Sequence, residues 1–391
     1  MWRGSRQAQS VLVVAAAAFS GMYVLFSAAP VMVAASAGSF GAGLITTVFM
    51  ALTIVAQFLT PFGLRRLPPA RLLLASLLFL SVPSVVYALD VAAWVLVVAA
   101  GLRGLGFGLM TIVCTALVSA YAEPGKQGSA IGVYGLATSV TGIVAPSLGV
   151  IILDGLGSGV VATAAFALPL VGAFFLKPIQ AGSPKPMAPR KADTMLADRV
   201  WTWARFAPLV IFVPVAVAYG GSYTFLPLFS ALAAFGLLML GVGFAIGRVI
   251  GGRLVDRSKS VWVITPFALV AAAGIVVLAW TPSDLFTPAA CLVLGFGIGG
   301  TASASLASMM ASVAPSRYGF VSTAWNLSFD LGIAIGGLGL GLLIAPLGLA
   351  SGASILAVVI VLTVLALFVP LSRLGRYHKE NRRDLSCDPK V

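Results

Sequence analysis

Asn326 and Asp330 lie four residues apart in the otherwise apolar stretch WNLSFDLGIAIGG (325–337). Residues with this spacing share one face of a helix, so the amide and the carboxyl group are expected to lie side by side. A carboxyl group held away from water takes up a proton more readily than one in solution. The pair therefore predicts a proton-binding acid, Asp330, with Asn326 as a neighbour that hydrogen-bonds either the carboxylate or the substrate. The alternative is a structural acid that stays permanently paired.

Two arginines, Arg103 and Arg248, also lie inside long apolar stretches. A charge at the centre of a bilayer costs roughly 2.5–3.5 kcal/mol on insertion scales, so such residues usually face a cavity or a partner. Arginine does not lose its proton, so Arg103 is expected either to bind an anionic group or to respond electrostatically to a carboxylate. The alternative is a structural role in which it donates to backbone carbonyls. Arg248 lies near the end of its stretch, from where a long side chain reaches the aqueous surface, which favours a structural role.

The composition indicates an integral membrane protein. Of the 391 residues, 60% are hydrophobic and 9% are charged, and the mean hydropathy is +1.07; soluble domains are typically about 25% charged. The net charge of +13 does not indicate a nucleic-acid partner, because the basic residues are spread between apolar stretches. With one histidine, His378, and three cysteines without a CxxC spacing, neither a metal site nor a cofactor is expected.

Twelve segments are long and apolar enough to cross about 30 Å of hydrocarbon, which needs roughly 20 residues. They are predicted at residues 9–34, 41–64, 70–89, 92–120, 128–153, 159–177, 207–229, 232–252, 261–280, 285–313, 318–345 and 350–371.

The basic residues predict the orientation of these segments. Lys and Arg precede the first segment, follow the second, fourth, eighth and tenth, fill the centre of the chain and recur in the tail. The alternate loops hold Asp90, Asp154 and Asp284 but neither Lys nor Arg. Cytoplasmic loops carry the excess of basic residues, so both termini are predicted in the cytoplasm.

A polar stretch, KPIQAGSPKPMAPRKADTMLADR (177–199), divides the chain near its centre. It is rich in Pro, Ala and charge, which predicts a flexible connector. We expect six-helix bundles at residues 1–177 and 207–371, a cytoplasmic linker at 178–206 and a cytoplasmic tail at 372–391.

The two halves are expected to be an internal duplication. An offset of 191 residues superposes three glycines of the first half on three of the second, namely Gly104, Gly106 and Gly108 on Gly295, Gly297 and Gly299. Repeated six-helix units of this kind are common in secondary transporters.

The stretch GRVIGGRLVDRSK (247–259) contains Gly252, Asp256 and Arg257. This pattern resembles the cytoplasmic loop motif of the major facilitator superfamily, and the twelve helices, cytoplasmic termini and central linker are similar to the same family. The resemblance implies that the acid and the arginine pair with neighbouring helix ends and hold the outward-facing state. The copy in the first half, PFGLRRLPPAR (61–71), has Arg65 and Arg66 but no acid, so the pairing is not expected there.

Two further stretches resemble motifs of the same family. RGLGFG (103–108) is similar to its intramembrane arginine motif, and GLATSVTGIVAPSLG (135–149) is similar to the Gly/Pro motif of its antiporters. In the second stretch Gly142, Pro146 and Gly149 match the motif. This likeness to the twelve-span drug:proton antiporters implies export. The alternative explanation of the Gly/Pro stretch is that its small residues only let neighbouring helices pack closely.

A substrate pocket is expected where the helices that face the central cavity of this family carry aromatic side chains. The candidates are Tyr23, Tyr219, Tyr223, Phe225 and Trp325, together with Arg103. The mostly apolar surroundings suit a hydrophobic or amphiphilic substrate. The alternative role of these aromatics is to anchor helix ends at the membrane interface.

We therefore expect an all-α membrane protein of the major facilitator fold, with twelve transmembrane helices in two pseudo-symmetric six-helix bundles. The expected function is proton-coupled export of small, largely apolar or amphiphilic organic compounds, by a monomer in the lipid bilayer of the cytoplasmic (inner) membrane. The alternative is a proton-linked importer or facilitator of a sugar or an organic anion, which Arg103 would support. An enzyme is not expected, because the sequence lacks a nucleophile–base constellation, a metal cluster and a phosphate-binding loop.

Overall fold

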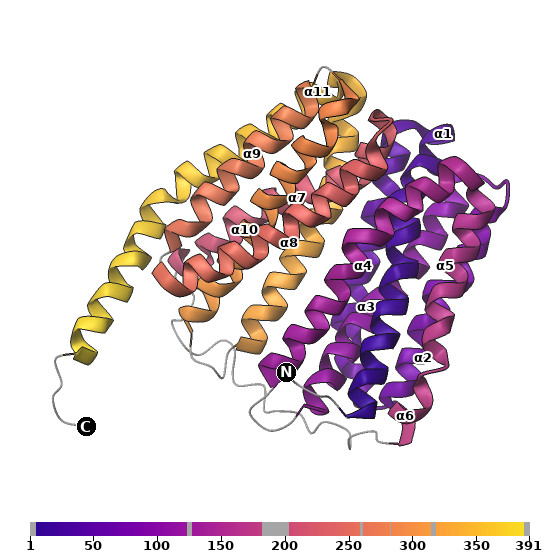
Figure 1. The fold of residues 1–391 in the computed structure, drawn as a ribbon, viewed down its shortest axis with the longest axis horizontal. Helices are drawn as coiled ribbons and strands as arrows, with labels where there is room; N and C mark the ends of the chain where they lie inside the picture. Colours follow the sequence, from indigo (N-terminus) through magenta and orange to yellow (C-terminus); the bar gives the residue numbers. More distant parts are fainter. Residues whose placement is uncertain are drawn as a thin grey trace. The chain divides into compact units, whose positions relative to one another are not determined.

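The computed structural model describes residues 5–122, 127–181, 203–258, 261–281, 283–313 and 318–386. Within these ranges the regular structure is entirely helical and contains no β-strand (Figure 1).

The helices follow the chain in the order predicted from hydropathy. The first half contains α1 (Arg6–Leu64), α2 (Pro69–Ser81), the 3₁₀ helix η1 (Val82–Ala88), α3 (Ala93–Ala120), α4 (Gln127–Leu156), α5 (Ser158–Ala173) and α6 (Leu176–Ala181). The second half contains α7 (Trp203–Phe229), α8 (Ala233–Ser258), η2 (Val261–Val263), α9 (Ile264–Trp280), η3 (Asp284–Phe286), α10 (Thr287–Ala311) and α11 (Tyr318–Ser386).

The described residues agree with the prediction of twelve apolar segments. Eight helical stretches are long and apolar enough to cross a membrane, and α5 and α9 are two shorter apolar helices. Two of the eight, in α1 and α11, are each divided into two arms by a glycine in the left-handed region, Gly38 (φ 61°) and Gly348 (φ 78°). Only glycine adopts this conformation without strain, so each marks a turn between two consecutive segments.

Two predicted boundaries differ from the structure, and the predicted end of the third span agrees with it to within one residue. The linker predicted at 178–206 is shorter, because α6 extends to Ala181 and α7 begins at Trp203; residues 182–202 lie outside the described ranges. The last span, predicted to end at 371, continues as helix to Ser386, since Leu, Arg, Lys and Glu in this stretch are good helix formers. The third span ends in η1, where Pro83 interrupts the α-helical hydrogen bonds.

The contacts divide the chain into two compact units. Unit 1 comprises residues 1–193, 220–238 and 333–346, and unit 2 comprises residues 194–219, 239–332 and 347–391. Two segments of the second half of the sequence therefore belong to unit 1: the end of α7 with the start of α8, and the middle of α11.

The glycine contacts confirm the internal duplication. In unit 1, methyl groups on Gly104 and Gly108 would meet the carbonyls of Phe49 and Thr53. In unit 2, methyl groups on Gly295 and Gly299 would meet the carbonyls of Leu240 and Phe244. The offset of 191 that relates the glycines also relates the residues that they touch. Gly106 and Gly297 follow the same rule, with Ser76 and Phe267 as their equivalent partners.

Large apolar side chains cover the outer surface of the helices. Trp94 is 69% exposed and Phe174 is 81% exposed. A soluble monomer rarely exposes contiguous apolar surface on this scale, whereas a helix in lipid does so without cost.

Candidate functional site

Arg103 lies on α3 and is 1% exposed. Its Nε donates to the carbonyl of Leu80 (3.1 Å) and one terminal nitrogen donates to the carbonyl of Gly21 (3.0 Å). The helix that contains Leu80 changes from α to 3₁₀ at Val82. The next residue, Pro83, has no N–H, so a carbonyl at this turn needs a donor from elsewhere. The guanidinium therefore joins α1, α2 and α3, which corresponds to the carbonyl-binding alternative predicted for it.

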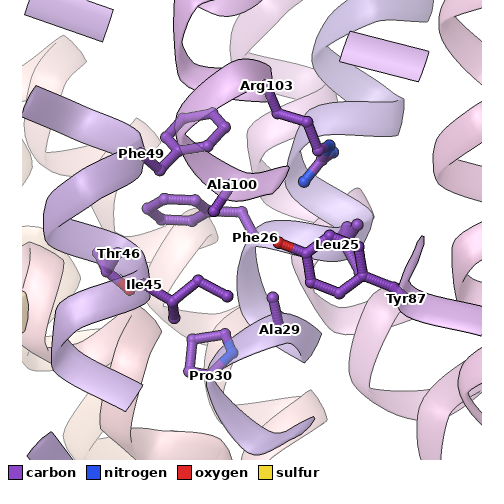
Figure 2. A pocket seen from close by; sticks show the side chains of 10 residues that line it. All are labelled: Leu25, Phe26, Ala29, Pro30, Ile45, Thr46, Phe49, Tyr87, Ala100 and Arg103. Carbon is purple, nitrogen blue, oxygen red and sulfur yellow. The ribbon is translucent and has the colours of Figure 1, made fainter. Parts of the chain in front are cut away.

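A small cavity lies beside Arg103 within unit 1 (Figure 2). Its lining is mostly apolar, with the rings of Phe26 and Phe49 on one side, and Thr46, Tyr87 and Arg103 supply the polar groups. The free volume of about 10 Å³ is close to what one water molecule needs. In the state described, this space does not accommodate an organic substrate.

Tyr87 was not among the residues predicted from the sequence. Its hydroxyl donates to the carbonyl of Leu96 (2.8 Å) in the first turn of α3, so it joins η1 to the start of α3. Tyr87 lies at the end of an apolar segment, where tyrosines commonly anchor helices at the membrane interface. The sequence therefore did not distinguish it from such an anchor.

Three of the predicted pocket aromatics lie in unit 1. Tyr23 and Tyr223 have ring centroids 6.3 Å apart, and Phe26 lies at the same distance from Tyr223. Phe225 is buried, with its Cζ 3.4 Å from the position that a Cβ on Gly341 would take. Tyr23 is half-buried, so it is the one of the three predicted residues with an accessible surface in this state.

The Gly/Pro motif packs α4 closely on α1. A methyl group on Gly149 would meet the carbonyl of Val24, and one on Gly142 would lie 3.3 Å from the ring of Tyr23. The hydroxyl of Ser27 donates to the carbonyl of Pro146 (2.7 Å). Both readings of the motif, close helix packing and a role in conformational change, are compatible with this geometry.

Threonines of α1 supply polar contacts that the sequence did not reveal. The hydroxyl of Thr47 donates to the carbonyl of Ala334 (2.6 Å) and accepts from the N–H of Leu338 (3.0 Å). The hydroxyl of Thr224 lies 2.9 Å from that of Thr46. Threonine is common in membrane-spanning helices, and nothing in the sequence around Thr46 and Thr47 predicted which groups they would bind.

Unit 2 contains a stack of three aromatic rings. Trp325 and Phe212 are nearly parallel, with centroids 4.9 Å apart and an interplanar angle of 8°. Phe329 stacks on the same pair at 5.6 and 5.7 Å. The indole N–H of Trp325 donates to the hydroxyl of Ser305 (3.0 Å). Trp325 is thus part of a packed core, and its spacing of four residues from Phe329 was the sequence signal for the stack.

Tyr219 extends this stack toward Arg248. Its ring centroid lies 5.4 Å from Phe329 and 5.3 Å from Phe244. The guanidinium carbon of Arg248 lies 5.6 Å from the centroid of the Phe244 ring, which is within the range of a cation–π interaction. The half-buried Arg248 therefore lies against an aromatic face, and its structural role stays a prediction.

Asp330 and Asn326 lie on α11, beside the aromatic stack in sequence. Asp330 is half-buried and Asn326 is exposed. The side-chain amide of Asn326 donates to the carbonyl of Ser322 (2.8 Å), which is a local bond within its own helix. Two residues after Asp330, a methyl group on Gly332 would meet the side chain of Ala216 on α7, so α7 and α11 approach closely beside the acid.

The motif at the end of α8 lies on a helix rather than on a loop. Gly252, Asp256 and Arg257 all fall within α8, and both charged residues are exposed in its last turn. Arg65 and Arg66 follow the end of α1 and are also exposed. The guanidinium of Arg65 lies over the ring of Phe62 at 5.6 Å.

The predicted site residues fall into two groups by unit. Unit 1 holds Arg103, Tyr23, Tyr223, Phe225, Gly142, Pro146 and Gly149, and unit 2 holds Asp330, Asn326, Trp325, Tyr219 and Arg248. The part of the chain that the structure describes contains no cluster of three or more His, Cys, Asp or Glu side chains suited to a metal.

Comparisons with known proteins identify the family from a sequence model and the fold from solved structures. A family model described as Major Facilitator Superfamily matches residues 11–337 and residues 239–385. A search of curated protein sequences gave no match.

Solved transporter structures are similar over nearly the whole chain. A POT family transporter in complex with 5-aminolevulinic acid has a TM-score of 0.77 at 13% identity, with 94% of this chain and 96% of that chain covered. A POT family transporter with a thioalcohol-conjugated peptide has a TM-score of 0.75 at 13% identity, with 94% and 96% covered. A bacterial homologue of the human lysosomal transporter Spinster, in an inward-facing and unoccupied conformation, has a TM-score of 0.72 at 16% identity, with 96% and 99% covered. At these identities the likeness concerns the fold alone.

Proposed function

The chain belongs to the Major Facilitator Superfamily, and on that premise we propose that it exports small, largely apolar or amphiphilic organic compounds in exchange for protons. It is a multi-pass secondary transporter and not an enzyme. Export, proton coupling and the cytoplasmic membrane as its location are the parts that the proposal adds.

The observation that carries the proposal is the position of Asp330. Of the 11 Asp and Glu residues in the sequence, Asp330 is the one inside a predicted span, and it is half-buried on α11. A carboxyl group in such a place changes its protonation with the polarity of its surroundings. Alternating exposure to the two sides of the membrane would then load and release a proton.

The aromatic stack beside Asp330 supports an apolar or amphiphilic substrate. Phe329, the residue before the acid, is half-buried and stacks on Trp325. Aromatic faces with few polar groups favour hydrophobic compounds. Arg103 does not support an anionic substrate in this state, because its side chain is buried and donates to two backbone carbonyls.

The test is a proton-flux measurement on purified protein in liposomes with an acidic lumen and a luminal pH-sensitive dye. Cationic, neutral and anionic compounds are added outside to wild type, to Asp330→Asn and to Asp154→Asn, which removes an exposed carboxylate at the end of α4. Antiport predicts that one class of compound makes the lumen more alkaline with wild type and Asp154→Asn, but not with Asp330→Asn.

Three results would count against the proposal in different ways. An equal response of Asp330→Asn would make this residue a structural acid. Further acidification of the lumen would indicate symport, which is the importer alternative that the likeness to a peptide-binding transporter keeps open. No response to any compound would remove the support for proton coupling.

A further inference from the structure

Pro146 leaves a carbonyl of α4 without its helical donor. In a regular α-helix the N–H of residue 146 would donate to the carbonyl of Gly142, but proline has no N–H. The hydroxyl of Tyr223 on α7 donates to this oxygen at 3.2 Å. Tyr223 is 1% exposed, so the bond replaces the missing helical one in a place that water does not reach.

The contacts around Pro146 fix α4 to α1 without help from Tyr223. Ser27 donates to the carbonyl of Pro146, and Gly149 packs directly on the backbone of Val24. In the alternating-access motion proposed above, Gly142 would stay with α1 while Tyr223 leaves with α7. The bond between them would then join two surfaces that separate.

Two neighbouring sets of polar contacts, one from α1 to α11 and one from α7 to α1, can be broken at little cost. The carbonyl of Ala334 and the N–H of Leu338 both bind Thr47, but they are four residues apart on one helix and can pair with each other. Thr224 binds the carbonyl of Gly220 on its own helix (2.8 Å) as well as Thr46. When the helices separate, the backbone groups of α11 and the hydroxyl of Thr224 therefore keep a partner within their own helices. The carbonyl of Gly142 does not, because residue 146 is a proline and has no N–H.

We propose that the bond from Tyr223 to the carbonyl of Gly142 is a latch that holds residues 220–229 of α7 closed against α1 and α4, and that Pro146 is what gives the latch its strength. The inference rests on the alternating-access transport proposed above. In the predicted orientation, the latch closes the non-cytoplasmic side, because α7 ends in a loop without Lys or Arg.

If this latch exists, the effect of removing the Tyr223 hydroxyl depends on whether residue 146 is a proline. Removal of the Tyr223 hydroxyl leaves the Gly142 oxygen buried and unsatisfied in the closed state only, since water reaches it in the open state. This penalty corresponds to a shift of roughly fivefold to 150-fold toward the open state. Restoring an N–H at position 146 satisfies the oxygen in both states and abolishes most of that shift.

The experiment measures the opening directly, without a substrate or a pH gradient. Thr46 is 2% exposed and is covered by Thr224 of α7, so Thr46→Cys reports separation of these helices. In a background with Cys114, Cys291 and Cys387 replaced by alanine, the protein is placed in lipid nanodiscs and labelled with a charged maleimide. The labelling rate is compared between the parent, Tyr223→Phe, Pro146→Ala and the double variant.

The latch predicts a labelling rate about 5- to 150-fold higher for Tyr223→Phe than for the parent, and less than about a twofold effect of the same change on top of Pro146→Ala. Two controls accompany it. Pro61→Ala removes an exposed proline of α1 and should leave the Tyr223 effect at full size. Tyr87→Phe removes a buried hydroxyl bound to Leu96 and should not change the rate.

Two results would overturn the latch: no acceleration in Tyr223→Phe, or equal acceleration with and without Pro146. If Pro146→Ala does not fold, the comparison of Tyr223→Phe with Tyr87→Phe still decides whether this hydroxyl holds the gate. The labelling rate does not depend on transport, so the two proposals are tested separately. The proton-flux measurement can contradict proton-driven export while the labelling supports the latch, and the labelling can contradict the latch while the proton flux supports export.

Discussion

Thr47 on α1 and Ala334 on α11 are joined by a hydrogen bond between two helices of unit 1. The hydroxyl of Thr47 donates to the Ala334 carbonyl at 2.6 Å and accepts from the N–H of Leu338 at 3.0 Å. One threonine therefore binds both members of a single backbone pair of α11. One turn earlier on α1, a methyl group on Gly43 would meet the carbonyl of Gly337. Small residues bring the two backbones close enough for the hydroxyl to reach them.

Replacing Thr47 by valine should lower the stability of the protein, because the side chain keeps its shape and loses both hydrogen bonds. The expected loss is about 0.6–1.7 kcal/mol, the range for single polar contacts between membrane helices. Thr47→Ser should retain most of the stability. The thermal unfolding midpoint in detergent measures the difference. Thr163→Val is the matched control, since Thr163 is exposed and binds only its own helix; an equal loss there would contradict the assignment.

Replacing Arg103 by lysine should destabilise the protein even though the charge is kept. Lysine lacks the planar fork that reaches the carbonyls of Gly21 and Leu80 together, and a hydrogen bond to a charged group is worth about 1.5–3 kcal/mol. We expect a lower thermal midpoint and a lower yield of folded protein. Arg66→Lys, at an exposed position, should behave as wild type. Normal stability of Arg103→Lys with impaired transport would instead favour an anion-binding role.

The duplication predicts matched penalties in the two halves. Gly106→Ala would place a methyl group 2.7 Å from the carbonyl of Ser76, and Gly297→Ala would meet the equivalent helix at Ala271. Backbone atoms cannot give way as side chains do, so each change should cost about 1–3 kcal/mol. Gly252→Ala has nothing within 4 Å and should be neutral or stabilising. Thermal midpoints of the three variants test the prediction, and a large difference between Gly106→Ala and Gly297→Ala would disprove the equivalence.

The role of Trp325 can be divided between its ring and its N–H. Trp325→Phe keeps an aromatic ring against Phe212 and loses the bond to Ser305, with an expected cost of about 0.5–1.5 kcal/mol. Trp325→Ala also empties the stack and should cost about 3–5 kcal/mol. Ser305→Ala should resemble Trp325→Phe. If Trp325 served only as a substrate contact, all three variants would unfold at the temperature of wild type.

Much of the fold follows from local features of the sequence. The twelve apolar segments, the turns at Gly38 and Gly348 and the repeat of Gly104 at Gly295 all depend on residues close together in the chain or on a constant offset. Hydropathy reports whether a segment lies in lipid, since the cost of burying polar groups there is paid residue by residue. For the same reason Asp330 and Arg103 were recognisable as unusual before any contact was known.

The sequence by itself determined which segments enter the membrane, which halves repeat and which buried charges needed an explanation. Only the tertiary structure decided what answers those needs: the carbonyls that Arg103 binds, the hydroxyl that Gly142 receives from Tyr223, and the backbone pair that Thr47 holds. The physical reason is that a single residue, such as a proline or a charged side chain in an apolar segment, is enough to create a buried polar group that needs a partner. That need can be recognised from the segment alone. The group that satisfies it comes from a neighbouring helix, and that neighbour is chosen by packing over the whole chain.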